Sequence, residues 1–254
     1  MDSLPPLVIL IVTSFLVLLA IELGFRIGVW QSRAMRIDSE ALLSSMTGAH
    51  LALLAFIMAF SFSLAANHYS TRNELVLMEA NAIAGAYRYA GLLEDDQRDK
   101  FRVLIRDYLA IRVTIADRYH FQPQQIIAAS EELLEAIWKE CEHLGLQRTD
   151  LEYQIFQSVD TLFQLHERRA SAGFNRIPNL IWITLFVLLM LSMLGIGHFS
   201  GVKGRRNPIS STVLALCFSI VLYLVSDLDR PTTGMVVVDH SPILKLGHRL
   251  GLDM

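Results

Sequence analysis

The sequence predicts an all-α fold: four transmembrane helices, with an extramembrane helical domain inserted between spans 2 and 3. Hydrophobic residues make up 53% of the 254 residues and mean hydropathy is +0.40, which is too apolar for an ordinary soluble domain. With their flanks, four uncharged runs approach the roughly 20 residues that cross a bilayer core. Between the second and third runs, apolar residues recur at helical spacing. The runs are 7–21, 51–66, 177–196 and 209–225.

The first two runs predict a transmembrane hairpin over residues 1–67, with spans at about 4–29 and 47–67. Pro5 and Pro6 suit the first turn of a helix, because proline lacks the backbone N–H that this turn leaves unbonded. No positively charged segment precedes the first run. We therefore expect it to be a retained anchor and not a cleaved signal peptide.

Residues 68–176 are predicted to form the helical domain outside the membrane. The second span is expected to continue into it as a helix through Leu93. This segment holds 13 Lys/Arg and 17 Asp/Glu, so its surface is moderately acidic and a general affinity for nucleic acid is not expected. Acidic first turns and breaking residues delimit the other helices. They are predicted at about 95–119, 124–144 and 149–172.

The C-terminal hairpin covers residues 177–226, with spans at about 177–198 and 209–226. A turn rich in glycine, proline and basic residues joins these spans. The tail, residues 227–254, contains several prolines and glycines. It is predicted to be irregular and not a fifth span.

The two short loops carry the charge that predicts the orientation. Both lie on one membrane face if there are four spans, and the positive-inside rule places that face in the cytoplasm. The helical domain then lies on the extracytoplasmic side. Arginines flanking the membrane on the other face reduce the charge difference. The cations of the short loops are Arg26, Arg33, Arg36, Lys203, Arg205 and Arg206.

The second span carries small residues at steps of three and four, and this pattern has two interpretations. Small residues on one face let helices approach closely in lipid. The same face could line a pore, with Ser61, Ser63 and Asn67 offering hydrogen bonds to a permeating ion. Both hold if several copies place their second spans around an axis. The small residues are Gly48, Ala52, Ala55, Ala59, Ser63 and Ala66.

Two ionisable residues lie within or beside the first two spans. Glu22 is a functional candidate, because ionisable groups within membranes are usually functional. Its spacing to Arg26 also fits a simple ion pair at the end of the span. His50 could titrate near neutral pH and relay protons, or it could be an ordinary interface residue.

The fourth span ends in a compact polar cluster. Asp227 and Asp229 could bind a cation or set the charge at a pore mouth. Arg230 could instead neutralise both carboxylates as part of a structural cap.

Glu79 and Asn81 are polar residues on an otherwise apolar helical segment. A buried carboxylate needs a partner. We expect Arg102 or Arg106 of the next helix to supply it, in a bond internal to the helical domain.

No motif in the sequence indicates an enzyme, a metal site or a cofactor. Phosphate-binding loops, dinucleotide-binding glycines, zinc-binding histidines and paired cysteines are all missing from the sequence. Cys141 and Cys217 belong to different predicted parts, so no disulfide is expected.

Five segments together resemble the bacterial bestrophin-like membrane family, a family of unknown function, over nearly the whole chain. The most specific is the closing D-R-P-x-x-G, although this chain has Thr232 where the family commonly has phenylalanine. The segments are 60–64 (FSFSL), 79–83 (EANAI), 177–182 (IPNLIW), 227–234 (DLDRPTTG) and 241–243 (SPI).

The resemblance implies a distant likeness to bestrophins, which are pentameric anion channels with four spans per subunit and a helical domain between spans two and three. Bestrophins line their pore neck with bulky apolar rings from the second span, whereas this second span has an alanine-rich face. They also keep the helical domain in the cytosol, which conflicts with the charge of the short loops. The resemblance therefore implies the architecture, and no pore residue.

Three functions remain open. The first is a homo-oligomeric ion channel in the lipid bilayer, with Ser63, Asn67, Asp227 and Asp229 near the ion pathway. The second is a non-conducting sensor or assembly scaffold that acts through the helical domain. The third is a proton-driven, stator-like subunit, for which Glu22 is the one candidate carboxylate.

Overall fold

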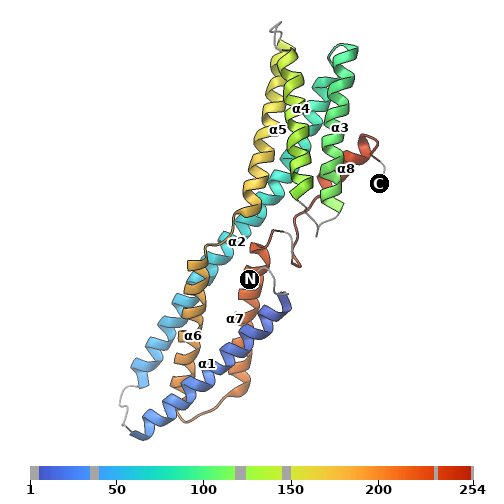
Figure 1. Ribbon diagram of the computed structural model, residues 1–254. Helices are drawn as coiled ribbons and strands as arrows, with labels where there is room; N and C mark the ends of the chain where they lie inside the picture. The colour runs from blue at the N-terminus through green and yellow to red at the C-terminus, as the bar shows by residue number, and fades with distance from the viewer. Residues whose placement is uncertain (1–5, 35–39, 118–123, 145–149, 232–233, 253–254) are drawn as a thin grey trace. The chain divides into compact units, whose positions relative to one another are not determined.

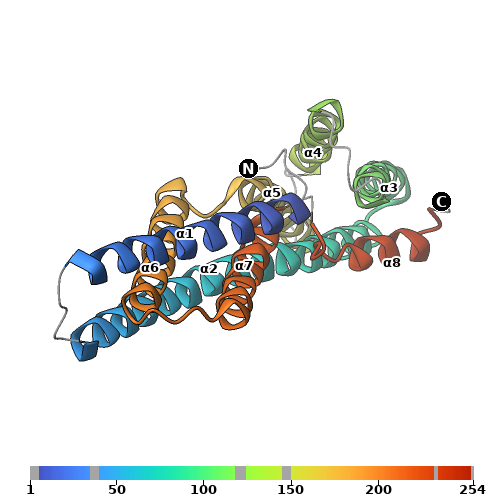
Figure 2. The same cartoon turned by 90° about the horizontal axis from the view of Figure 1, so that it is seen from below.

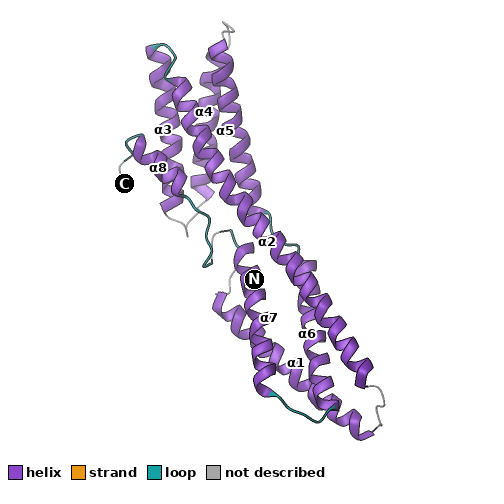
Figure 3. Cartoon of the chain, turned by 180° about the vertical axis from the view of Figure 1, so that it is seen from behind, coloured by secondary structure: helices purple, strands orange, loops and turns teal. Residues whose placement is uncertain are grey.

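The computed structural model describes residues 6–34, 40–117, 124–144, 150–231 and 234–252. All regular elements in these ranges are helices, as predicted (Figure 3). The chain divides into a transmembrane unit (residues 1–68 and 176–236) and a helical unit (69–175 and 237–254). The helices, labelled in Figure 1, are α1 (Pro6–Ala34), α2 (Glu40–Ala90), α3 (Asp95–Asp117), α4 (Gln124–Leu144), α5 (Asp150–Phe174), α6 (Asn179–Val202), α7 (Pro208–Asp229) and α8 (Ser241–Arg249).

The transmembrane unit contains α1, the first part of α2, α6 and α7. The described residues include four helical stretches long and apolar enough to cross a bilayer, which confirms the four predicted spans. Many of their large apolar side chains face outward, among them Phe15, Leu180 and Ile209 at 65%, 74% and 76% exposed. Lipid is the natural surrounding for such a surface.

Helices α1 and α6 run parallel and touch through glycine. A Cβ on Gly24 or Gly28 would collide with the backbone of α6, and one on Gly197 or Gly201 would collide with the backbone of α1. Small residues at four-residue spacing on both helices therefore allow the backbones to meet. Because the two helices are parallel, their C-terminal ends lie at the same end of the unit.

Helix α2 is a single helix of 51 residues. At 1.5 Å per residue it is about 77 Å long, more than twice the roughly 30 Å of a bilayer core. It therefore continues out of the membrane as predicted, although it ends at Ala90 and not at Leu93.

The helical unit packs the second part of α2 with α3, α4, α5 and α8. Figure 2 shows α3 and α4 nearly end-on. Its core includes Ile83 of α2, Phe101 and Ile105 of α3, Ile137 of α4 and Leu162 of α5, each at most 1% exposed. The predicted helix at 124–144 is found with the same bounds. The other two are found at 95–117 and 150–174, and their predicted residues 118, 119 and 149 lie outside the described residues.

The prediction of an irregular tail is wrong for residues 241–249, which form α8. Pro242 lies in the first turn of α8, where a missing N–H costs nothing. Ile243 and Leu246, three residues apart, are buried in the core of the helical unit. A proline that appears to break structure in the sequence thus begins a helix.

Candidate functional site

One face of the membrane-spanning part of α2 is not covered by the other helices of its own unit. Leu54, Met58, Ser61 and Ala65 are buried on the covered face. The opposite side, called here the outward face of α2, is exposed along the whole span. It consists of Ala52, Phe56, Ala59, Phe60, Ser63 and Asn67.

The small residues noted in the sequence lie along this outward face or beside it. Gly48 and Ala55 are exposed and Ala66 is half-buried. They are therefore not used mainly for packing within one chain. A helix face of this kind is available to lipid, to a second copy of the chain or to water.

The outward face is not only alanine-rich. Phe56 and Phe60, one helical turn apart, are 67% and 58% exposed. Together they add two bulky apolar side chains to a face that otherwise carries mainly small residues. The sequence alone did not identify them, because two phenylalanines in a run of apolar residues carry no signal until one side of the helix is seen to be uncovered.

The polar residues predicted near the second span are placed differently from one another. Ser63 and Asn67 lie on the outward face, whereas Ser61 is buried and its hydroxyl donates to the carbonyl oxygen of Ile57 at 2.9 Å. The side chain of His50 is exposed, and its backbone carbonyl lies 3.4 Å from the hydroxyl of Ser192 in α6.

Glu22 forms an ion pair, as one of the two interpretations of the sequence proposed. Its Oε1 accepts from Nε of Arg26 at 2.9 Å and from a terminal guanidinium nitrogen of Arg206 at 3.1 Å. Arg206 comes from the loop between α6 and α7. The carboxylate, 41% exposed, therefore connects α1 to the loop between α6 and α7.

Asp227 is 1% exposed at the end of α7. Its carboxylate accepts hydrogen bonds from the backbone N–H groups of Met235 and Val236, at 2.8–3.0 Å. A Cβ on Gly234 would lie only 2.6 Å from Oδ1 of Asp227. The carboxylate thus fixes the bend of the chain after the fourth span, and glycine is required beside it.

Asp229, at the end of α7, contacts residues of α2 and of the segment that leads into α6. Its Oδ1 accepts from the backbone N–H of Ile177 at 2.9 Å, just before α6, and lies 3.9 Å from Nδ1 of His68 on α2. Asp229 and Arg230 are 7% and 6% exposed. The geometry favours the structural interpretation of this cluster, and the role of Asp227 and Asp229 in an ion pathway stays a prediction.

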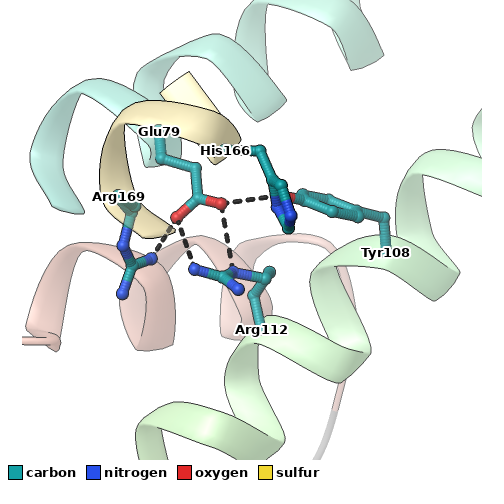
Figure 4. Close-up of polar contacts among 5 residues, drawn as sticks. All are labelled: Glu79, Tyr108, Arg112, His166 and Arg169. Atoms are coloured by element: carbon teal, nitrogen blue, oxygen red, sulfur yellow. Dashed lines mark hydrogen bonds and ion pairs between the residues drawn. The ribbon is translucent and has the colours of Figure 1, made fainter. Parts of the chain in front are cut away.

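The helical unit holds a buried cluster of charges around Glu79, which is fully buried (Figure 4). Arg112 of α3 approaches as a fork, at 3.0 Å to Oε1 and 3.2 Å to Oε2. Arg169 of α5 contacts Oε2 from the other side. The hydroxyl of Tyr108 donates to Oε1 at 2.6 Å and lies 3.2 Å from Nδ1 of His166.

The predicted internal bond of Glu79 is therefore present, but the expected partners were wrong. The partners are Arg112 and Arg169; Arg102 instead stacks on Tyr87, and Arg106 donates to the carbonyl oxygen of Gly251. Asn81, predicted alongside Glu79, is exposed and lies outside the cluster.

The cluster is held by charge in spite of its burial. Burial alone would raise the pKa of Glu79, but the guanidinium groups of Arg112 and Arg169 and the hydroxyl of Tyr108 outweigh it and lower the pKa to about 2. Burial and the carboxylate raise the pKa of Tyr108 well above its ordinary value. The carboxylate stays ionised and the phenol stays neutral at neutral pH.

Two histidines border the cluster. Burial and Arg112 lower the pKa of His166. His240, which directly precedes α8, has a pKa lowered to about 4 by burial and then by Arg169 and Arg112. Both imidazoles therefore stay neutral at a pH at which a free histidine begins to protonate.

The sequence carries a signal for this cluster in the spacing of its buried residues. Tyr108 and Arg112 continue the buried line of α3 that begins with Phe101 and Ile105, and Arg169 continues the buried line of α5. A cation within an apolar helical line needs a buried anion. Among the described residues, no group of three or more His, Cys, Asp or Glu is placed to hold a metal ion.

Comparison with known proteins gives one family. A family model for the "Bestrophin-like domain" matches residues 14–243. No curated protein matches the sequence.

Several solved structures share the fold. Two structures of a bacterial Bestrophin homolog from Klebsiella pneumoniae, each with a single substitution, align with TM-scores of 0.66 at 14% and 13% identity. Each alignment covers 96% of this chain and 97% of the other. A structure described only as a membrane protein aligns with a TM-score of 0.65 at 14% identity, over 93% of this chain and 96% of that one.

Proposed function

Because the chain belongs to the bestrophin-like family, we propose that it forms a homo-oligomeric ion channel whose pathway is lined by the outward face of α2. The observation that supports this is the exposure of that face in a helix whose opposite side is buried. Several copies around an axis would bring these faces together. Water and ions would then contact Ser63 and Asn67, and lipid would surround the outer helices.

Phe56 and Phe60 would form the narrow part of this pathway. Apolar rings restrict ion flow by excluding water. Replacing either phenylalanine by alanine should therefore raise ion flux, while each subunit stays folded because both side chains are mostly exposed within their own chain.

Thiol labelling tests the lining directly. Cys217 is exposed on α7 and is first replaced by alanine; Cys141 can stay, because burial raises its pKa to about 12 and thiols react as thiolates. In this background, Ser63→Cys and Asn67→Cys are reconstituted in liposomes and treated with a charged thiol reagent. We expect modification to change ion flux.

Ile220→Cys is the matched control, because Ile220 is 53% exposed on α7 but is not on the proposed lining. A thiol facing lipid should not react with a charged reagent. Equal effects at positions 63 and 220 would contradict the lining, and no flux under Cl⁻, K⁺, Na⁺ or H⁺ gradients would contradict the channel.

A non-conducting sensor or scaffold is the second candidate. It is supported by exposed apolar side chains on the helical unit, including Leu92, Val103 and Tyr153 at 64%, 56% and 64%. Crosslinking that recovers one stoichiometric partner, together with silent liposomes, would favour this function over a channel.

The orientation in the bacterial inner membrane also stays a proposal. The parallel α1 and α6 bring the basic residues at their C-terminal ends to one end of the transmembrane unit, which supports a cytoplasmic location for this end and an extracytoplasmic helical unit. In the background lacking Cys217, an impermeant thiol reagent on intact cells should label Glu132→Cys and not Arg205→Cys. The reverse pattern would place the helical unit in the cytosol.

A further inference from the structure

The transmembrane unit has one end at which cations from the C-terminal part of α1 meet cations from the loop after α6. Residues 22–34 and 200–208 contain five Lys or Arg against a single carboxylate, Glu22. The parallel contact of α1 and α6 brings these two segments side by side. All five cations are exposed, and we call them the basic end. They are Arg26, Arg33, Lys203, Arg205 and Arg206.

The basic end is held in place by contacts between its two segments. Glu22 accepts from both Arg26 and Arg206, at 2.9 and 3.1 Å. Nε2 of His198 lies 2.6 Å from Oε1 of Gln31. These bonds join α1 to α6 and to the loop that follows it, so the spacing of the two segments that carry the cations is set by the fold before any ligand arrives.

Two of the cations rest on aromatic rings. The guanidinium of Arg206 lies 4.4 Å from the ring centre of Phe25, and Nζ of Lys203 lies 4.4 Å from that of Phe199. Cation–π contact reduces the freedom of a long side chain. The cations are thus kept beside the helix ends, while the Trp30 side chain, 72% exposed, points outward at the same end.

We propose that the basic end binds the phosphodiester headgroups of anionic phospholipids. A phosphodiester carries one negative charge and two free oxygens, which suit the paired donors of a guanidinium and the point charge of an ammonium. The basic end lies where α1 and α6 leave the bilayer, which is headgroup level. Exposed tryptophan at that level is typical of a membrane interface.

The position of the cations selects lipid over a soluble phosphate compound. A lipid headgroup is held at the bilayer surface by its own acyl chains, so it reaches the cations at high local concentration. A dissolved phosphate compound could form the same bonds, but it lacks this local concentration, and salt screens its attraction to exposed cations. The proposal rests on the four-span fold and does not require ion conduction.

Lipid-dependent thermal stability of the full-length protein tests this proposal. The purified protein is reconstituted in phosphatidylcholine alone or mixed with phosphatidylglycerol, and Tm is measured in each. We expect phosphatidylglycerol to raise the Tm of the wild type, and added salt to reduce the rise. Each cation near a charged membrane surface raises the affinity for anionic lipid about fivefold. The double variant Lys203→Gln with Arg205→Gln should therefore weaken binding of the anionic lipid by about 25-fold.

The matched control removes the same two residue types from the helical unit, as Lys139→Gln with Arg168→Gln. Both residues are exposed and lie far along the sequence from the basic end. This control should keep the full response to phosphatidylglycerol. The proposal is overturned if the two double variants respond alike, if salt leaves the response unchanged, or if inorganic phosphate in phosphatidylcholine raises Tm as much as the lipid does.

Discussion

The hydroxyl of Tyr108 on α3 donates a hydrogen bond of 2.6 Å to the carboxylate of Glu79 on α2, and both side chains are fully buried. This bond ties the long helix to the helical unit at a point where two guanidinium groups also converge. Buried charges of this kind are costly to break, because each removed partner leaves another charge uncompensated.

Removing the carboxylate should therefore destabilise the helical unit strongly. Glu79→Gln leaves Arg112 and Arg169 without an anion and should cost about 3–5 kcal/mol. Tyr108→Phe removes one buried donor and should cost about 1–3 kcal/mol. Asn81→Ala, exposed two residues from Glu79, should change stability by less than about 0.5 kcal/mol. Denaturant unfolding of the three variants would contradict this order if Asn81→Ala proved as harmful as Glu79→Gln.

The contact between α1 and α6 should be sensitive to one methyl group. A Cβ at position 197 meets the backbone of Ile21 and Phe25, which cannot move aside, so Gly197→Ala should cost about 1–3 kcal/mol. Gly195→Ala, on the same helix, meets nothing within 4 Å. It should be neutral or slightly stabilising, since alanine is the better helix former. Thermal unfolding in one detergent compares the two variants, and equal Tm values would refute the glycine contact.

Acid should weaken the helical unit in two stages. The pKa of His240 is about 4 in the fold against an ordinary 6.5, so the unfolded chain binds more protons between these values. Stability is then fully present above about pH 6.5 and falls as pH drops towards 4, by at most about 2 kcal/mol at pH 5 and less where solvent screens the group. His166 adds a change of the same sign. Glu79 contributes next, between its ordinary pKa of 4.5 and about 2.

Amide exchange of α8, corrected for its intrinsic pH dependence, measures the first stage. Lowering the pH from about 7 to about 5 should speed exchange of residues 243–249. His240→Gln should reduce this pH dependence, because glutamine does not titrate. His248→Gln, exposed on α8, is the control and should behave as the wild type. A pH response that is the same in all three proteins would exclude His240 as its source.

The bend after the fourth span should depend on Gly234. Alanine there would crowd the carboxylate of Asp227 and weaken its bonds to Met235 and Val236. We expect Gly234→Ala to lower stability by about 1–3 kcal/mol. Gly173→Ala, where a Cβ meets nothing within 4 Å, should have little effect on Tm. If Asp227→Ala were harmless, the carboxylate would not be what fixes this bend.

Local sequence predicted most of the helices but only part of the candidate site. The uncharged runs marked the four spans, and Pro123 and Gly145 bracketed the helix at 124–144. The same local reasoning failed at Pro242, because burial of Ile243 and Leu246 against distant helices decides that α8 forms. It identified Glu79 as needing a partner, but not which arginine would reach it.

The sequence by itself determined the four spans, the helical insertion between them and the paired small residues, because hydropathy and helical periodicity are properties of neighbours along the chain. Only the tertiary structure decided that Glu79 meets Arg112 and Arg169, that Asp227 and Asp229 bind backbone amides, and that one face of α2 stays uncovered. These contacts and the uncovered face depend on which side of each helix packs against a neighbouring helix. Residues far apart in the chain decide that packing together.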